Sequence, residues 1–187
     1  MKIRHILAFG LLIGSLIAAN NHDSTLYSTN TGTVNFFSHT DIEDIEGENH
    51  KVKAAFDAKS GKIQFSLLVK DFEFEKSLME EHFNENYMES TKYPRATFSG
   101  TIDQIEKIDL SKDGQYSSPV SGKLKIKDVV QEITALGTFT VKNGVVNGKS
   151  EIVVHPEDYH IKIPKVVRNK ISNDIVVSMD VDFKHKH

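Results

Sequence analysis

Residues 77–98, SLMEEHFNENYMESTKYPRATF, contain the one helical pattern in a chain that otherwise has the composition of β-strands. Ser77 can cap the first turn, and Glu80 three positions later can bond back to the Ser77 amide, which is a capping-box pattern. Pro94 ends the pattern, because proline cannot continue a helix and also restricts the residue before it. The sequence therefore predicts a helix that starts at Ser77 and ends before Pro94.

One face of this predicted helix is apolar. Met79, Phe83 and Tyr87 recur every fourth residue, while Glu81 and Glu85 occupy the other side. Side chains four residues apart share a helix face. We therefore expect the helix to lie on an apolar surface and to expose its carboxylates to water.

Apolar and polar residues alternate on both sides of the helix, as expected for strands with one buried face. Turn signals separate these segments, with Gly61 and the pair Asn143-Gly144 as the clearest hairpin signals. Eight strands are expected, at residues 33–38, 51–57, 62–69, 96–103, 121–127, 129–141, 146–154 and 175–183.

Eight antiparallel strands with one apolar face each can bury those faces by closing into an up-and-down barrel. A two-sheet sandwich is the alternative. The helix, inserted between the third and fourth strands, favours the barrel because it is placed to cover one open end. Small residues on the predicted inner face leave volume inside, so the interior either holds a ligand or is filled by opposing side chains: Ala54, Ala96, Gly122, Ala135 and Gly137.

The N-terminus has the pattern of a cleavable signal peptide. Lys2 and Arg4 precede an apolar run over residues 6–19 that is too short for a permanent membrane span. We expect a signal peptide at 1–19, a flexible lead at 20–32 and one domain at 33–187, exported to the periplasm. The sequence has no cysteine, so the core alone must hold this domain together in an oxidising compartment.

Composition and motifs argue against several function classes. The formal net charge is −3 and we find no basic block, so neither a nucleic-acid partner nor a polybasic membrane patch is expected. The histidines lack ligand spacing; His155 and His160, which flank a turn, are the one pair that supports a metal-dependent hydrolase as a residual hypothesis. We predict no catalytic residues, no metal site and no cofactor.

Several segments resemble the YceI-like family. They are residues 36–47, the hairpin at Gly61, the run KYPRATF at 92–98, the strand VSGKLKI at 120–126 and the pair Asp158-Tyr159. The sequence departs from the family pattern at 127–130 and in the length of the helix. The resemblance implies an exported, lipocalin-like barrel that holds a polyisoprenoid or fatty-acid derivative along its axis.

The predicted function is therefore non-catalytic binding, transport or sequestration of a long apolar ligand. About fifteen buried methylenes contribute ~12 kcal/mol before ordering costs. The alternative is a protein-interaction or stress-response module with a filled barrel, and a homodimer that completes the pocket is left open. The predicted ligand-binding residues are Phe36, Phe65, Phe72, Phe74, Met79, Phe83, Tyr87, Phe98, Leu124, Phe139 and Met179.

Overall fold

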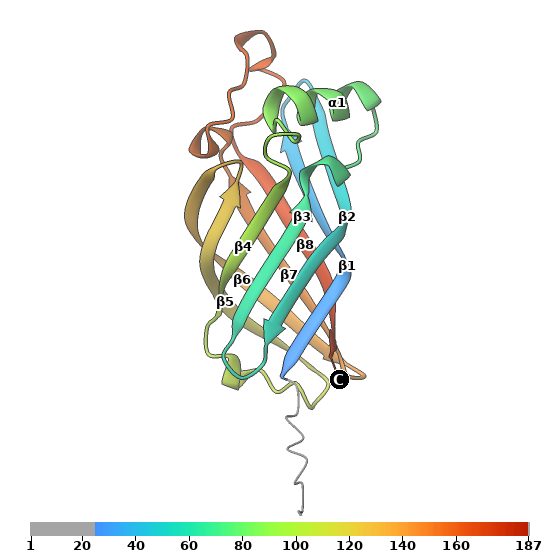
Figure 1. Ribbon diagram of the computed structural model, residues 1–187, viewed down its shortest axis with the longest axis vertical. Helices are drawn as coiled ribbons and strands as arrows, with labels where there is room; N and C mark the ends of the chain where they lie inside the picture. The colour runs from blue at the N-terminus through green and yellow to red at the C-terminus, as the bar shows by residue number, and fades with distance from the viewer. Residues whose placement is uncertain (1–24, 187) are drawn as a thin grey trace, which may run out of the picture.

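The computed structural model describes residues 25–186 and forms a closed barrel of eight antiparallel strands (Figure 1). Each strand pairs with the next in the chain, and the last pairs with the first, so the predicted up-and-down barrel is confirmed and the sandwich is wrong. The strands are β1 (Leu26–His39), β2 (Asp44–Asp57), β3 (Lys62–Leu68), β4 (Arg95–Ile102), β5 (Gly114–Ile126), β6 (Val129–Lys142), β7 (Val145–Val154) and β8 (Ile175–His185).

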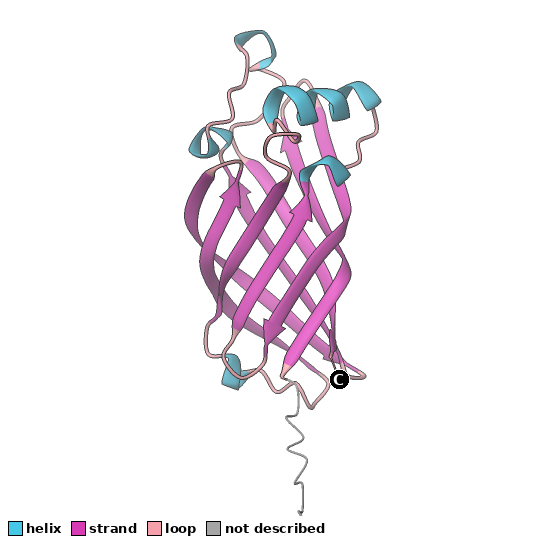
Figure 2. Ribbon diagram, viewed as in Figure 1, coloured by secondary structure: helices cyan, strands magenta, loops and turns pink. Residues whose placement is uncertain are grey.

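The connections divide between two ends of the barrel, which we call the mouth end and the closed end. The mouth end carries the β1–β2, β3–β4, β5–β6 and β7–β8 connections, whereas the closed end carries the other three. Figure 2 shows that most helical segments gather at the mouth end. These are η1 (Val69–Asp71), α1 (Ser77–His82), η2 (Phe83–Tyr87), η4 (Pro156–Tyr159) and η5 (Lys165–Val167); η3 (Ile105–Lys107) lies at the closed end.

The first strand starts seven residues earlier than predicted. β1 begins at Leu26, which pairs with Asp57, so residues 26–32 are strand and not a flexible lead. These residues are mostly polar, but the strand passes close to β8: a Cβ added to Gly32 would lie 2.3 Å from Val181 Cγ1. The pairing of β1 shifts register on both sides of Gly32, which indicates a bulge where the strand passes Val181.

The helix is confirmed between β3 and β4 and starts at Ser77 as predicted, but its cap and its extent differ from the prediction. Lys76 is the N-cap residue, and its carbonyl oxygen accepts bonds from the amides of Met79 at 2.9 Å and Glu80 at 3.3 Å. No side chain caps the helix, so the predicted capping box does not form. α1 continues as the π-helix η2 and stops at Tyr87, because Glu89 takes a positive φ of 49°.

A packed core fills the barrel at the closed end. The Phe56 and Phe183 side chains are 1% and 0% exposed, and their rings meet edge to face with centroids 5.0 Å apart. Tyr27 stacks on Phe56 at 4.9 Å, which adds the early part of β1 to this core. Burial of each such aromatic side chain is worth roughly 1.5–3 kcal/mol, so the closed end supplies much of the stability of the fold.

The predicted signal peptide at residues 1–19 lies outside the described residues. Within residues 25–186, no helix has both the length and the apolar character needed to cross a bilayer.

Candidate ligand-binding cavity

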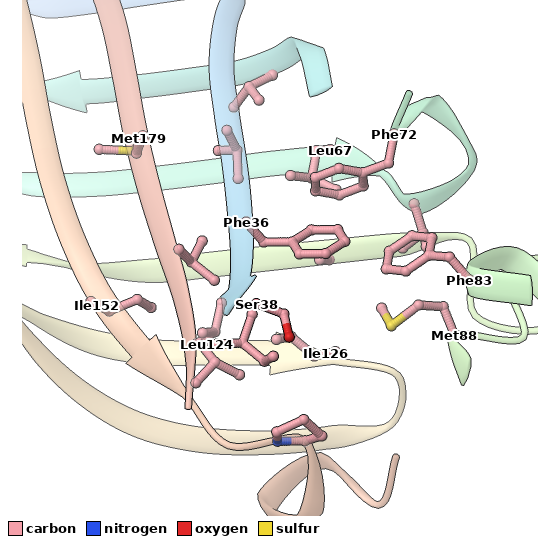
Figure 3. Close-up of a pocket in the computed structure, with 18 of the residues that line it drawn as sticks. Phe36, Ser38, Leu67, Phe72, Phe83, Met88, Leu124, Ile126, Ile152 and Met179 are labelled. Carbon is pink, nitrogen blue, oxygen red and sulfur yellow. The ribbon is translucent and has the colours of Figure 1, made fainter. Parts of the chain in front are cut away.

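A cavity of about 610 Å³ occupies the half of the barrel toward the mouth end. The inner faces of the strands form its wall, and α1, η2 and the β7–β8 connection line its entrance (Figure 3). All eleven predicted ligand-binding residues line this cavity. Volumes of this size are typical of small-molecule sites.

Four phenylalanine rings form a cluster between the barrel wall and the helix. Phe36 from β1 stacks on Phe83 from η2 with centroids 5.2 Å apart, and it lies 5.4 Å from Phe72 and 5.6 Å from Phe74. Phe83 is also within 5.4 Å of both of these rings. A Cβ on Gly47 would approach the Phe36 ring to 2.5 Å, so a glycine there leaves room for the cluster.

The backbone between η1 and α1 sets the direction of two of these rings. Glu73 pairs with Glu48 of β2 through two backbone hydrogen bonds, at 3.0 and 2.8 Å. Alternate residues of an extended segment point to the same side. Phe72 and Phe74, on either side of Glu73, therefore both face the cavity.

Small residues do not by themselves create this cavity. Ala96, Ala135 and Gly137 line it, as expected, but Ala54 is buried in the closed-end core and Gly122 lies outside the lining. A Cβ on Gly122 would lie 2.8 Å from the Phe98 ring, which already occupies that space. The cavity depends on where the large rings point, which strand alternation does not reveal.

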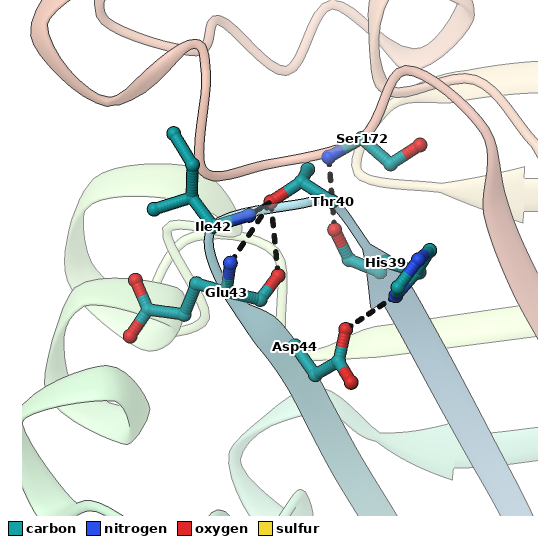
Figure 4. A network of polar contacts seen from close by, with 7 residues as sticks. His39, Thr40, Ile42, Glu43, Asp44 and Ser172 are labelled. Carbon is teal, nitrogen blue, oxygen red and sulfur yellow. Dashed lines mark hydrogen bonds and ion pairs between the residues drawn. The ribbon is translucent and has the colours of Figure 1, made fainter.

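The β1–β2 turn forms one side of the mouth (Figure 4). Thr40 organises it: its hydroxyl accepts the Glu43 amide at 3.1 Å, and its own amide donates to the Glu43 carbonyl at 3.2 Å. The buried Ser38 hydroxyl accepts the backbone amide of Ser172 at 2.9 Å, which joins this turn to the β7–β8 connection.

Charged side chains meet at the rim of the cavity. The two Glu43 carboxylate oxygens lie 3.7 Å from the ammonium groups of Lys76 and Lys170, and all three side chains line the cavity entrance. The sequence does not reveal this group, because its members come from three connections that are distant in the sequence. A local signal for it is Thr40, whose hydroxyl accepts the amide of Glu43 three positions later.

Lys127 fixes the end of η2 to the barrel. Its ammonium group donates to the Tyr87 carbonyl at 3.2 Å and to the Glu89 carboxylate, and its side chain is 11% exposed. The hydrogen bond from Lys127 holds the pKa of Glu89 below its usual value. Burial raises the pKa of Tyr87, whose ring lines the cavity. Lys127, in the segment where the sequence departs from the family pattern, is thus the attachment point of the helix.

The histidine pair of the hydrolase hypothesis does not form a metal cluster. His155 lies 3.3 Å from Asp158 and 3.1 Å from Asp174, an arrangement of ion pairs in which His160 takes no part. Over residues 25–186, no group of three or more metal-binding side chains comes together.

The fold and the cavity define a class of single-domain β-barrels with an apolar interior pocket that is open at one end. This chain belongs to the YceI-like family: the YceI-like domain matches residues 26–183, almost the whole described chain. No curated protein matches the sequence of this chain.

Solved structures share the fold at low sequence identity. A polyisoprenoid binding domain from Saccharophagus degradans, implicated in plant cell wall breakdown, is 14% identical, with a TM-score of 0.76 over 87% of this chain and 99% of that domain. BcnA of Burkholderia cenocepacia is 17% identical, with a TM-score of 0.67 over 81% and 95%. The YceI protein of Campylobacter jejuni is 16% identical, with a TM-score of 0.56 and full coverage of both chains.

Proposed function

We propose that this protein binds one long apolar molecule, of the polyisoprenoid or acyl-lipid class, inside the barrel and does not catalyse a reaction on it. The observation that carries the proposal is the continuous apolar wall of the 610 Å³ cavity. Its polar groups gather at the rim, where Glu43, Lys76 and Lys170 lie. The polyisoprenoid binding domain of Saccharophagus degradans, which shares this fold, supports the same class of ligand.

The volume matches a chain of intermediate length. A methylene group needs about the volume of a water molecule, ~30 Å³, so the cavity accepts roughly 20 such groups. At ~0.8 kcal/mol for each buried methylene, the gross gain is ~16 kcal/mol, of which ordering and association costs remove a large part. Affinity then depends mainly on the length of the chain.

We further propose that the eleven predicted residues contact this ligand, and that the protein transports or sequesters it in the periplasm after removal of residues 1–19. Support for export comes from the N-terminal sequence pattern. The alternative, an interaction module with a filled barrel, fits the closed-end core but does not account for the open half.

Native mass spectrometry of protein purified without detergent tests the proposal, followed by solvent extraction and identification of the released molecule. We expect a stoichiometric apolar molecule. A clean unliganded mass, together with failure to take up long-chain prenyl or acyl lipids, refutes the proposal and favours the interaction module.

A further inference from the structure

The β7–β8 segment, which we define as residues 159–173, has an apolar inner face and a cationic outer face. Its inner residues line the cavity: Ile161, Ile163, Val167 and Ile171. Its outer residues are exposed and basic: Lys162, Lys165 and Arg168. No acidic residue interrupts the sequence between Asp158 and Asp174. The expectation that the chain has no basic block is therefore wrong for this segment.

Exposed apolar side chains gather at the mouth end. Among the described residues, six large apolar side chains are exposed, and five of them lie in or beside mouth-end connections: Ile42, Leu78, Val130, Val153 and Val166. Val166 is the most exposed, at 85%, and it belongs to η5, which projects beyond α1 at this end of the molecule (Figure 1). The closed-end turns carry none of the six.

The charges of the β7–β8 segment are largely free to meet a partner. Lys170 lies 3.7 Å from Glu43, but within residues 25–186 no carboxylate pairs with Lys162, Lys165 or Arg168. The exposed carboxylates of the helix belong to another connection, and the exposed Glu157, Asp158 and Asp174 lie next to the ends of β7 and β8, so positive charge concentrates at the tip of the segment, residues 162–168. Cations that surround an exposed apolar residue are typical of segments that bind a membrane surface.

We propose that the β7–β8 segment docks the mouth of the barrel onto an anionic lipid bilayer. In this arrangement Val166 enters the headgroup region, and Lys162, Lys165 and Arg168 contact lipid phosphates. The inner face of the same segment lines the cavity, so docking brings the cavity entrance to the bilayer. The proposal rests on the proposed function for its purpose, which is exchange of the apolar ligand with the membrane.

Sedimentation with vesicles of phosphatidylcholine and phosphatidylglycerol tests this surface, with pure phosphatidylcholine vesicles as the reference. We expect the wild-type protein to bind the anionic vesicles and to dissociate in high salt. Each basic side chain near such a surface contributes a factor of about five to binding. The triple variant Lys162→Gln, Lys165→Gln, Arg168→Gln should therefore bind about a hundredfold more weakly, and Val166→Ser about tenfold more weakly.

The control is the triple variant Lys59→Gln, Lys107→Gln, Lys142→Gln, which removes the same charge from exposed residues of the closed end. It should bind vesicles like the wild type. The proposal is overturned if the wild type ignores anionic vesicles, or if the two triple variants behave alike. Uptake of a fluorescent fatty acid by the wild-type protein is measured in parallel, without vesicles. If the protein takes up the fatty acid but does not bind vesicles, only the docking proposal is refuted. If it takes up no fatty acid, the proposed function is refuted as well.

Discussion

Filling the cavity from its floor gives a direct test of whether the barrel is hollow. Ala135 lines the cavity and pairs across the sheet with Val120, which belongs to the closed-end core. In Ala135→Phe the new ring enters empty space, so its burial should contribute ~1.5–3 kcal/mol, less the cost of displaced water and of small shifts. We expect a net gain in the free energy of unfolding of about 1 kcal/mol.

The matched control is Ala54→Phe. Ala54 also faces inward but is packed in the closed-end core. An added ring there overpacks the core and should cost at least 1–3 kcal/mol. The two variants make the same chemical change, so opposite changes in the free energy of unfolding would reflect the difference in local packing alone.

Urea denaturation measures both free energies of unfolding, and fatty-acid titration measures the consequence for binding. The new ring in Ala135→Phe adds ~100 Å³ and takes the place of about three methylenes at ~30 Å³ each, a gross loss of ~2.4 kcal/mol for a chain that reaches the floor. Long chains should lose up to roughly sixtyfold in affinity, while chains about three carbons shorter keep theirs. If both variants are destabilised, or if Ala135→Phe binds chains of all lengths as tightly as the wild type does, the half of the barrel toward the mouth end is not hollow.

Three further predictions concern the helix and the closed end. Phe83→Ala removes three aromatic contacts, so it should lower the free energy of unfolding by about 2–4 kcal/mol and weaken lipid uptake. Urea denaturation and lipid titration measure the two effects. Unchanged uptake in a folded variant would show that Phe83 is not part of the ligand-binding wall. Lys127→Met removes the hydrogen bond that fixes the end of η2 to the barrel, so a fluorescent lipid should exchange about tenfold faster in a stopped-flow experiment. An unchanged exchange rate would show that Lys127 does not restrain the helix. The hydroxyl of Thr25, with the Ser60 amide, lowers the pKa of Asp57 from 3.8 to about 2, so its contribution is present above pH 3.8 and lost as the pH falls toward 2. Asp57→Asn should remove up to about 1 kcal/mol of that acid dependence, because solvent screens this partly exposed carboxylate. Identical pH profiles of stability for the variant and the wild type would contradict this contribution of Asp57.

The sequence predicts the barrel well because its signals are local. Inward residues alternate along each strand, and turn signals such as Asn143-Gly144 mark the hairpins, so the number and order of strands follow from patterns of a few residues. The same alternation identifies which side chains point inward. This is why all the predicted wall residues line the cavity.

The parts that the sequence misses depend on contacts between distant residues. The early part of β1 is polar and becomes a strand because it pairs with β2 and β8 and passes Val181 at Gly32. The N-cap residue of α1 is Lys76, whose side chain makes no cap hydrogen bond, so this end of the helix has no capping signal in the sequence. The rim around Glu43 joins three connections that only the closed barrel brings together.

The division of the barrel into a packed half and a hollow half has an energetic consequence. A dry, empty cavity costs roughly 24 cal/mol for each Å³, so 610 Å³ corresponds to about 15 kcal/mol, as much as the whole stability of a typical domain. The closed-end core cannot offset such a cost alone. Either water enters through the mouth or an apolar ligand fills the space. Water in contact with an apolar wall gains few hydrogen bonds, whereas a lipid chain recovers the dispersion contacts that the empty wall lacks. The same feature that makes the unliganded barrel costly is therefore the driving force that the proposed function assigns to binding of a long apolar molecule.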